Sequence, residues 1–222
     1  MARDNQPKHR QLAREQARLA RGRASRAGLP SFLIVCEGRE TEPNYLSGFC
    51  EAELINGANV HIRSGGAATD PVALVRRARS LFETDRDYDY VAVVCDEAPN
   101  LTLAADLAAK AMRHADGKRQ VHVDLIVSRP CIEFWLLLHF EYSTRAFATA
   151  ADAVATLRRH VTDYDKADRR LFAKVGGGVE RAIGHVQRLK RDLAASGARS
   201  PDSDMPRLLS ELRKASRRES GR

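Results

Sequence analysis

The stretch FLIVCEGRETE, residues 32–42, decides the fold. Its first half is a short continuous apolar run rich in β-branched side chains, which is the pattern of a strand covered on both faces. Its second half places Glu37 directly after the strand, followed by Gly38. A carboxylate at the exit of a buried strand is costly unless it is solvated, paired or bound to a cation. Glu37 is therefore the first candidate site residue.

Three further strands and the helices between them follow from this one. The apolar patterns predict strands within residues 58–64, 87–96 and 121–128, and helices within residues 41–56, 69–85, 101–112 and 130–140. The helix at 69–85 has the clearest start, with Asp70 as N-cap and Pro71 in its first turn. The order βαβαβαβα with short connections predicts an α/β, Rossmann-like fold with a central four-stranded, mainly parallel sheet and helices on both faces.

Acidic residues follow the predicted strands where such folds bind ligands, beyond the carboxyl ends. Glu37, Asp96 and the segment 128–133 all fall there. Glu37 and Asp96 could supply oxygen ligands to Mg²⁺, which takes one or two protein carboxylates and completes its shell with water and substrate phosphate. A free carboxylate could act as general acid or base. Acids at strand ends also serve as helix N-caps or as partners of arginine, and the spacing alone leaves both interpretations open.

The pattern becomes wholly helical after residue 150, with AADAVATLRRHV at 150–161 and ERAIGHVQRLKRDLAA at 180–195. We therefore predict three parts: a basic N-terminal arm at 1–28, an α/β domain at 29–145, and a helical C-terminal extension with a basic tail at 146–222. The VGGGV stretch at 175–179 follows no strand and lacks the Lys-Ser/Thr ending of a phosphate-binding loop, so it is predicted to be a loop or hinge.

The positive charge is concentrated at the two ends of the chain. The formal net charge is +8, yet the sequence between the arm and the tail is close to neutral. A basic arm without a bulky apolar face favours a nucleic-acid partner over a membrane, and a purely solubilising arm is the alternative. The arginines predicted to contact phosphates are Arg10, Arg14, Arg18 and Arg21.

The four cysteines and the N-terminus indicate a cytoplasmic protein. The cysteines show no CxxC spacing and lie in apolar patterns, so we expect reduced, buried thiols. No apolar run reaches the length of a membrane span, and the arm lacks the apolar core of a secretory signal. An organelle transit peptide is a further interpretation of the basic arm, against which Asp4 and Glu15 argue. The sequence leaves homo-oligomerisation open.

Four motifs in this order and spacing resemble the RloB-like family: FLIVCEGRETEPNYLSGF, YDYVAVVCDE, VSRPCIEFWLLLHF and YDKADRRLF. Members have a strand ending in CEG-x-x-TE, a strand ending in an Asp-x-Asp type acid pair, and an Asn-Pro-Cys-Phe-Glu-Leu-Trp-Leu-Leu-Leu-His-Phe box. The resemblance covers roughly residues 20–215. The first and third motifs are long enough to be specific.

The resemblance implies a TOPRIM-like fold, the compact Rossmann-type domain of topoisomerases, primases and a group of phage-defence nucleases. It implies a metal-dependent endonuclease that hydrolyses phosphodiesters of DNA or RNA in phage defence, often beside an AAA-type ATPase. In such a site Glu37 is the general acid/base and Asp96 holds Mg²⁺ or Mn²⁺. Glu133, in the first turn of the predicted helix at 130–140, is a second catalytic candidate, and stabilisation of the helix dipole is its alternative role.

The sequence departs from the family pattern where the metal would bind. Ala98 stands in place of the second Asp, and Glu97 can replace it only if the chain has already turned, because neighbours on a strand point to opposite faces. Glu133, Glu40 and Glu42 are other candidates for the missing ligand. These departures motivate a competing hypothesis, a non-catalytic nucleic-acid-binding or ATPase-regulatory subunit with a degenerate metal site.

Two basic residues near the predicted site have open roles. Arg129 replaces the Asn of the family box, and it could bind substrate phosphate or neutralise Glu37 or Asp96. Lys166 resembles a recurring family lysine, and it could contact phosphate or be a plain surface lysine. Both are predicted to contact nucleic acid. His139 is expected to be a hydrogen-bonded core histidine.

Overall fold

A computed structural model describes residues 30–68, 70–197 and 200–217 of the 222-residue chain. The predicted nucleic-acid contacts of Arg10, Arg14, Arg18 and Arg21 lie outside the described residues and stay predictions.

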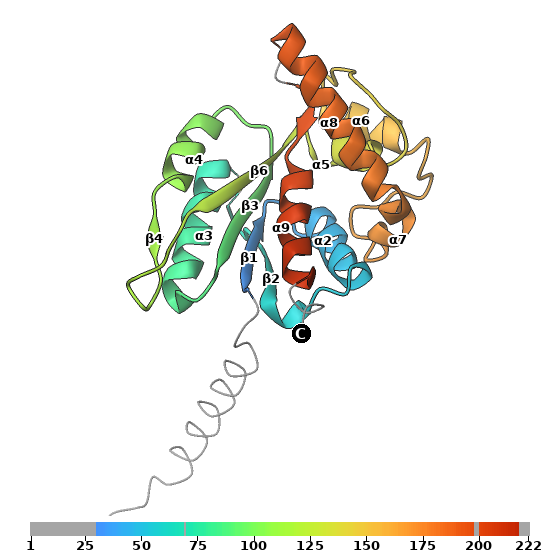
Figure 1. The fold of residues 1–222 in the computed structure, drawn as a ribbon. Coiled ribbons are helices and arrows are strands. Elements are labelled where there is room, and N and C mark those ends of the chain that lie inside the picture. The colour runs from blue at the N-terminus through green and yellow to red at the C-terminus, as the bar shows by residue number, and fades with distance from the viewer. Residues whose placement is uncertain (1–29, 69, 198–199, 218–222) are drawn as a thin grey trace, which may run out of the picture.

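The central sheet has five strands in the order β2-β1-β3-β6-β7 (Figure 1). The first four are parallel to their neighbours, and β7 is antiparallel to β6. The strands are β1 Phe32–Cys36, β2 Val60–Ser64, β3 Tyr90–Asp96, β6 Val123–Arg129 and β7 Asp202–Ser203. The predicted α/β fold with a mainly parallel, Rossmann-like sheet is confirmed, with one strand more than the four expected.

Helices cover both faces of the sheet (Figure 1). One face is covered by α3 (Pro71–Asp85) and α4 (Leu101–Ala108). The other is covered by α2 and the C-terminal helices. These are α2 Thr41–Ala52, α5 Ile132–Leu137, α6 Ala150–Leu157, α7 Leu171–Val175, α8 Val179–Ser196 and α9 Met205–Arg217. Two short 3₁₀ helices, η1 (Gly57–Asn59) and η2 (Gly176–Gly178), complete the set.

Alternate side chains of β1 enter two separate hydrophobic cores, as the pleat of a strand requires. Phe32, Ile34 and Cys36 pack with α2 and the C-terminal helices. Leu33 and Val35 pack with α3 and α4. All five side chains are buried, which is why the strand reads as one continuous apolar run in the sequence.

The helical C-terminal extension belongs to the first of these cores. Leu189 of α8 and Leu208 and Leu212 of α9 are fully buried in the same cluster as Ile34 and Tyr45. The boundary predicted at residue 146 stays a prediction. The packing shows that the helices beyond that residue are needed to cover one face of the sheet.

Two parts of the chain differ from the structure expected from the sequence. In both, a short strand forms by pairing with another strand. Residues 202–203 form β7, where Ser203 pairs with Ser128 of β6 and their hydroxyls lie 3.0 Å apart in the interior. The helix predicted for residues 101–112 ends at Ala108, and Met112 begins a short hairpin of β4 (Met112–Arg113) with β5 (Gln120–Val121).

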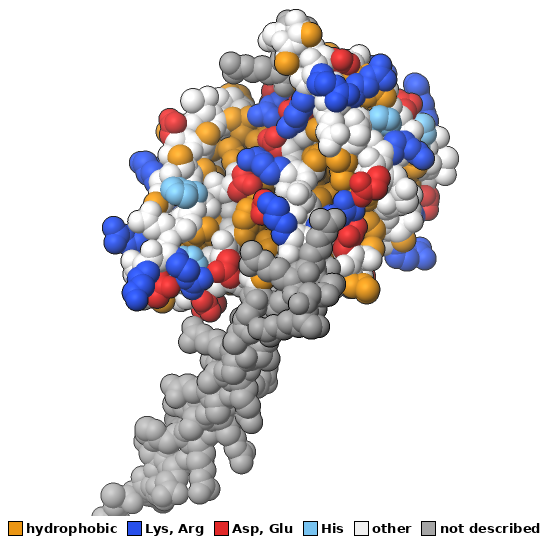
Figure 2. All heavy atoms as spheres, in the orientation of Figure 1, with side chains coloured by type: hydrophobic (Ala, Val, Ile, Leu, Met, Phe, Trp, Pro, Cys, Tyr) orange, Lys and Arg blue, Asp and Glu red, His pale blue; other side chains and the backbone are white. Residues whose placement is uncertain are grey.

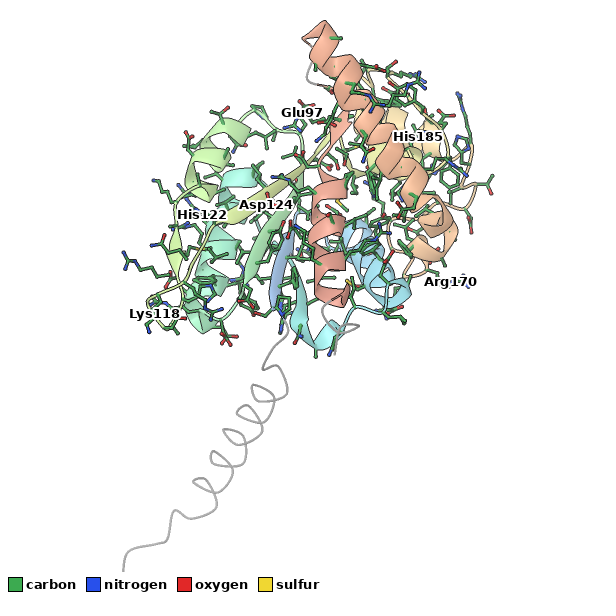
Figure 3. The ribbon with its side chains drawn as sticks, viewed as in Figure 1. Glu97, Lys118, His122, Asp124, Arg170 and His185 are labelled. Atoms are coloured by element: carbon green, nitrogen blue, oxygen red, sulfur yellow. The ribbon has the colours of Figure 1, made fainter. Side chains whose placement is uncertain are left out.

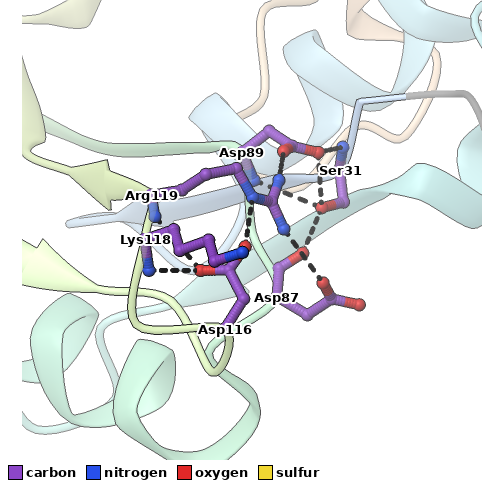
Figure 4. Close-up of polar contacts among 6 residues, drawn as sticks. All are labelled: Ser31, Asp87, Asp89, Asp116, Lys118 and Arg119. Carbon is purple, nitrogen blue, oxygen red and sulfur yellow. Dashed lines mark hydrogen bonds and ion pairs between the residues drawn. The ribbon is translucent and has the colours of Figure 1, made fainter.

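An ionic network ties together the amino-terminal edge of the sheet (Figure 4). Arg119, on the β4–β5 hairpin, binds the carboxylates of Asp116 at 3.0 Å and Asp89 at 2.6 Å. Asp89 also accepts a hydrogen bond of 2.9 Å from the backbone N–H of Ser31, just before β1. The network thereby connects the starts of β1 and β3 to the hairpin. Hydrogen bonds from Arg119 hold the pKa of Asp116 well below its usual range.

The buried polar features expected from the sequence are confirmed. Asp70 caps α3, with its Oδ1 accepting from the backbone N–H groups of Val72 at 3.0 Å and Ala73 at 3.1 Å. His139 is buried, with Nε2 3.1 Å from the Tyr45 hydroxyl and Nδ1 3.0 Å from the Trp135 carbonyl oxygen. All four cysteines are free and buried, and burial raises the pKa of Cys50 to about 12.

Within the described part of the chain, no helix is both long and apolar enough to cross a membrane.

Shared packing predicts that the C-terminal helices and the sheet unfold together. Leu212→Ala, which removes a fully buried side chain of α9, should lower the free energy of unfolding by about 2–5 kcal/mol. The fluorescence of the buried Trp135 and the far-UV circular dichroism should report one common transition during urea titration. The control is Leu103→Ala on α4, a leucine that is 60% exposed, which should change stability by less than about 0.5 kcal/mol. Two separated transitions would contradict the shared core.

Candidate active site

Glu37 connects the carboxyl ends of β1 and β3. Its backbone N–H donates to the Val94 carbonyl oxygen at 2.9 Å and so continues the strand pairing one residue past β1. Its side chain then turns to β3, where Oε2 accepts a 3.0 Å hydrogen bond from the backbone N–H of Asp96. The Glu37 carboxylate is therefore held at the sheet edge by an amide of the neighbouring strand, and it remains partly exposed.

Asp96, the last residue of β3, connects the sheet to α5. Its Oδ1 accepts a 2.9 Å hydrogen bond from the backbone N–H of Ile132, the first residue of α5. The N–H groups of a helix start lack intrahelical partners, so the Asp96 carboxylate satisfies one of them. One oxygen of Asp96 is thus fixed by the protein.

Glu42, in the first turn of α2, is a buried third carboxylate, with 4% of its surface exposed. Its Oε1 accepts a 3.0 Å hydrogen bond from the backbone N–H of Gly38. A Cβ atom at residue 38 would lie 2.1 Å from Oε2 of Glu42. The glycine is therefore required by the close approach of this carboxylate to the backbone.

Glu133, in the first turn of α5, is the most deeply buried acid of the group, at 1% exposure. Its Oε1 binds Lys166 Nζ at 2.8 Å and accepts a 3.0 Å hydrogen bond from the Tyr164 hydroxyl. Its Oε2 is buried and has no hydrogen-bond partner among the described residues. Both partners come from the loop between α6 and α7, so the C-terminal extension completes this side of the site.

These four carboxylates form an acidic cluster, defined as Glu37, Glu42, Asp96 and Glu133, and they perturb one another electrostatically. Burial raises the pKa of Asp96 to about 8, assisted by the negative charges of Glu42, Glu133 and Glu37. Burial also raises the pKa of Glu42, to which the charges of Glu37 and Glu133 add. A protein that only needed helix caps here would not concentrate so much like charge in one buried place.

Lys166 supplies the positive charge that partly offsets this repulsion. Burial by itself would raise the pKa of Glu133, but the hydrogen bond and charge of Lys166 hold that pKa below its usual range. Partial burial lowers the pKa of Lys166, and its bond to Glu133 more than compensates and raises it. Lys166 is 61% exposed, so it can lie over the acids while still facing solvent.

The structure brings four of the acids named from the sequence to one place, and the neighbouring Glu97 is exposed. Glu37, Glu42, Asp96 and Glu133 belong to the acidic cluster. Glu97 is exposed at the sheet edge (Figure 3), and its backbone N–H donates to the Pro130 carbonyl oxygen at 3.2 Å. The charges that act most on Asp96 are those of Glu42, Glu133 and Glu37. Glu42 is therefore a better candidate than Glu97 for the second carboxylate of a metal site.

Arg129 lies in a different ion-pair environment from the one expected. Its guanidinium is 3.8 Å from Oδ2 of Asp204, and no ion pair joins it to Glu37 or Asp96 within the described residues. Asp204 also binds Lys190 of α8 at 3.1 Å, so Arg129 belongs to a network that holds β6 next to α8. Its predicted contact with nucleic acid stays a prediction.

The sequence pattern missed Tyr164 and gave Glu42 only as one of several alternatives. Glu42 lies four residues after Gly38, and this spacing in GRETE is the signal that a helix-start carboxylate can return to the turn. Tyr164 stands two residues before Lys166 in a loop with no helical or strand periodicity. Nothing in its local pattern indicates that its hydroxyl reaches an acid 31 positions earlier.

The cluster suits a cation that keeps most of its own water. Across residues 30–68, 70–197 and 200–217, no three His, Cys, Asp or Glu side chains converge as a ready-made metal site. Mg²⁺ commonly binds through only one or two protein carboxylates, with water and phosphate oxygens as its other ligands. A cation at this place would favour the ionised form of Asp96, whose pKa is raised, and would give the buried Oε2 of Glu133 a partner. The residues present therefore fit a divalent cation at Asp96, with Glu42 or Glu133 beside it.

Comparison with known proteins gives one match. The family model described as RloB-like protein matches residues 32–212, which includes all four acids of the cluster. No curated protein and no solved structure shows a significant match to the chain.

The raised pKa of Asp96 predicts a pH-dependent loss of stability that a neutral isostere removes. Between about pH 4 and pH 8 the folded state holds a proton on Asp96 that the unfolded state releases, so the free energy of unfolding falls progressively over this range and the loss is complete above about pH 8. Even one pKa unit of this shift corresponds to about 1.4 kcal/mol. Asp96→Asn should therefore be more stable than the wild type at pH 9 and equal to it near pH 4.

Urea denaturation from pH 4 to pH 9 measures this difference. Glu97→Gln is the matched control, because it removes an exposed carboxylate just outside the cluster. Equal stability of Asp96→Asn and wild type at pH 9 would contradict the electrostatic strain on Asp96.

Proposed function

The chain belongs to the RloB-like protein family, and from this premise we propose that it is a TOPRIM-like, metal-dependent nuclease that hydrolyses phosphodiester bonds of nucleic acid. The observation that carries the proposal is the acidic cluster at the carboxyl edge of the parallel sheet. That edge is where folds of this class bind ligands. A cluster in which burial, assisted by like charge, raises a carboxyl pKa to about 8 is a typical feature of catalytic sites.

In the proposed reaction, Glu37 transfers the proton. Its Oε2 is occupied by the Asp96 amide, so Oε1 is the atom available to take a proton from the attacking water or to give one to the leaving oxygen. The partial exposure of Glu37 lets water and substrate reach it. A divalent cation, when bound, would stabilise the negative charge that develops on the phosphoryl group.

Asp96 is the residue proposed to hold the cation. Its Oδ1 is fixed by the Ile132 amide, which orients the carboxylate. Its raised pKa means that it holds a proton near neutral pH, and a cation bound beside it would lower that pKa and displace the proton. Glu42 and Glu133 lie close enough to add to the negative potential. Lys166, half in solvent above Glu133, is placed to contact a non-bridging phosphate oxygen.

Family membership also supports, as proposals, a role in phage defence and an AAA-type ATPase partner. The alternative function is a non-catalytic nucleic-acid-binding or ATPase-regulatory subunit. Two observations favour it: Ala98 stands where the family pattern has its second Asp, and Lys166 already neutralises Glu133.

Cleavage assays on single-stranded and duplex DNA and RNA with Mg²⁺ or Mn²⁺ test the proposal. Glu37→Gln should lose activity by about 100-fold or more, because it removes the general acid/base. Asp96→Asn should lose activity to a comparable degree, whereas Glu97→Gln should keep most of it. Metal-dependent cleavage that survives both Glu37→Gln and Asp96→Asn would exclude this site, and binding without cleavage by any of the proteins would favour the non-catalytic alternative.

Metal binding can be tested without activity. At pH 8, 10 mM Mg²⁺ should stabilise the wild type by about 1.4 kcal/mol if the dissociation constant is about 1 mM. Asp96→Asn should show no such gain in thermal or urea unfolding, and Glu97→Gln should show all of it. An equal gain in Asp96→Asn would place the cation elsewhere.

A further inference from the structure

Helix α8 presents a basic face to solvent. The residues of this face come later in the sequence than those of the acidic cluster. Arg181, Gly184, Arg188 and Arg191 recur at helical spacing along one side of the helix, and all four are exposed. One acid adjoins this side of the helix, Asp192, whose Oδ2 lies 3.9 Å from Nε of Arg188, and the three arginines exceed it in charge. Figure 2 shows Lys and Arg side chains gathered over α8, with His side chains beside them. This face therefore has a positive potential suited to a polyanion.

Two preformed stacks of planar groups lie alongside this face. The guanidinium of Arg188 lies 4.0 Å from the centroid of the Tyr142 ring. The imidazole of His160 is parallel to the Phe140 ring, with an interplanar angle of 8° and a centroid distance of 5.0 Å. The outer member of each stack is accessible, since the side chains of Arg188 and His160 are 60% and 29% exposed.

The segment that carries the two rings is fixed against α8 by hydrogen bonds. Arg181 Nη1 donates to the His139 carbonyl oxygen at 3.1 Å, and His185 Nδ1 lies 2.8 Å from the Leu138 carbonyl oxygen. The Tyr142 hydroxyl donates to the Asp192 carboxylate further along the helix. His185 can be followed on α8 in Figure 3. The stacks are thus held in place before any ligand arrives, which lowers the entropic cost of binding.

We infer that this surface binds single-stranded nucleic acid. Unpaired bases continue the two stacks, one on the outer face of the Arg188 guanidinium and one on the outer face of the His160 imidazole. Arg181 and Arg191 pair with the phosphates between and beside them. Aromatic and guanidinium planes combined with a basic groove are the usual means by which proteins bind single strands. A duplex keeps its bases stacked on one another and could use only the charges.

Helix α8 also contacts the carboxyl edge of the sheet, through Lys190 on another side of the helix. Lys190, on the flank of α8, binds Asp204 at 3.1 Å and Asp202 at 3.6 Å. Asp202 belongs to β7, which pairs with the end of β6. The inference deepens the proposed function by naming the substrate class and its docking surface, and it rests on that function only for the fate of the bound strand.

Fluorescence anisotropy with labelled single-stranded RNA and DNA of about 12 nucleotides tests the inference, using the full chain in EDTA so that no cleavage occurs. Arg188→Ala and His160→Ala should each weaken binding about 5-fold or more, because stacking of one base is lost. Arg188→Lys should weaken it nearly as much as Arg188→Ala, since lysine keeps the charge and loses the plane. The matched control is Arg77→Ala, an exposed arginine of α3 on the opposite face of the sheet, which should change affinity less than 2-fold, roughly the effect of one distant charge.

Three outcomes would overturn the inference: unchanged binding in Arg188→Ala and His160→Ala, a loss in Arg77→Ala as large as theirs, or wild-type affinity in Arg188→Lys. Tighter binding of a duplex than of the single strand would overturn it as well. The result is separable from the nuclease proposal. If binding depends on Arg188 but no metal-dependent cleavage occurs, the binding surface is retained and the nuclease proposal is rejected. If cleavage is lost in Glu37→Gln but binding does not depend on Arg188, the nuclease proposal is retained and the binding surface is rejected.

Discussion

The hydrogen bond from the Asp96 amide to Oε2 of Glu37 is the contact on which the geometry of the candidate site depends. It joins the ends of β1 and β3, and the Asp96 carboxylate extends the connection to the first N–H of α5. A strand end, its neighbour and a helix start are therefore locked together through two short polar contacts. Because these groups are backbone amides on buried elements, the carboxylates they hold have little freedom to reorient, which is the condition for a preorganised site.

The same arrangement concentrates like charge on groups that are partly or fully buried. Burial and like charge together raise the pKa of Asp96, whereas the hydrogen bond and charge of Lys166 lower the pKa of Glu133. A purely structural cluster would be expected to contain enough cations to neutralise its acids, since unpaired buried charge is costly. The described residues leave one oxygen of Glu133 without a partner inside the protein.

The fold and the three principal acids could be predicted because the signals for them are local. β1 is buried on both faces, so its sequence is continuously apolar, and the acids that follow β1 and β3 must meet because parallel strands end at the same edge. β7 could not be predicted, since two residues acquire strand geometry only by pairing with Ser128 and Arg129 of β6. Glu97 was predicted as a metal ligand only if the chain had turned at that point; β3 ends at Asp96 and the Glu97 side chain is exposed, so its metal role stays a prediction.

The C-terminal helices do more than extend the domain, because each side of the candidate site depends on them. They bury one face of β1, and the loop between α6 and α7 supplies both Tyr164 and Lys166 to Glu133. The pairing of β7 with β6 then brings Lys190 of α8 to the carboxyl edge, next to Arg129 and Asp204. A chain ending at residue 145 would keep the acids at the strand ends, and it would lose Lys166, whose ammonium group binds Glu133. The acids and their partners therefore form one unit, in which the α/β core supplies the carboxylates and the helical extension supplies Lys166 and Tyr164.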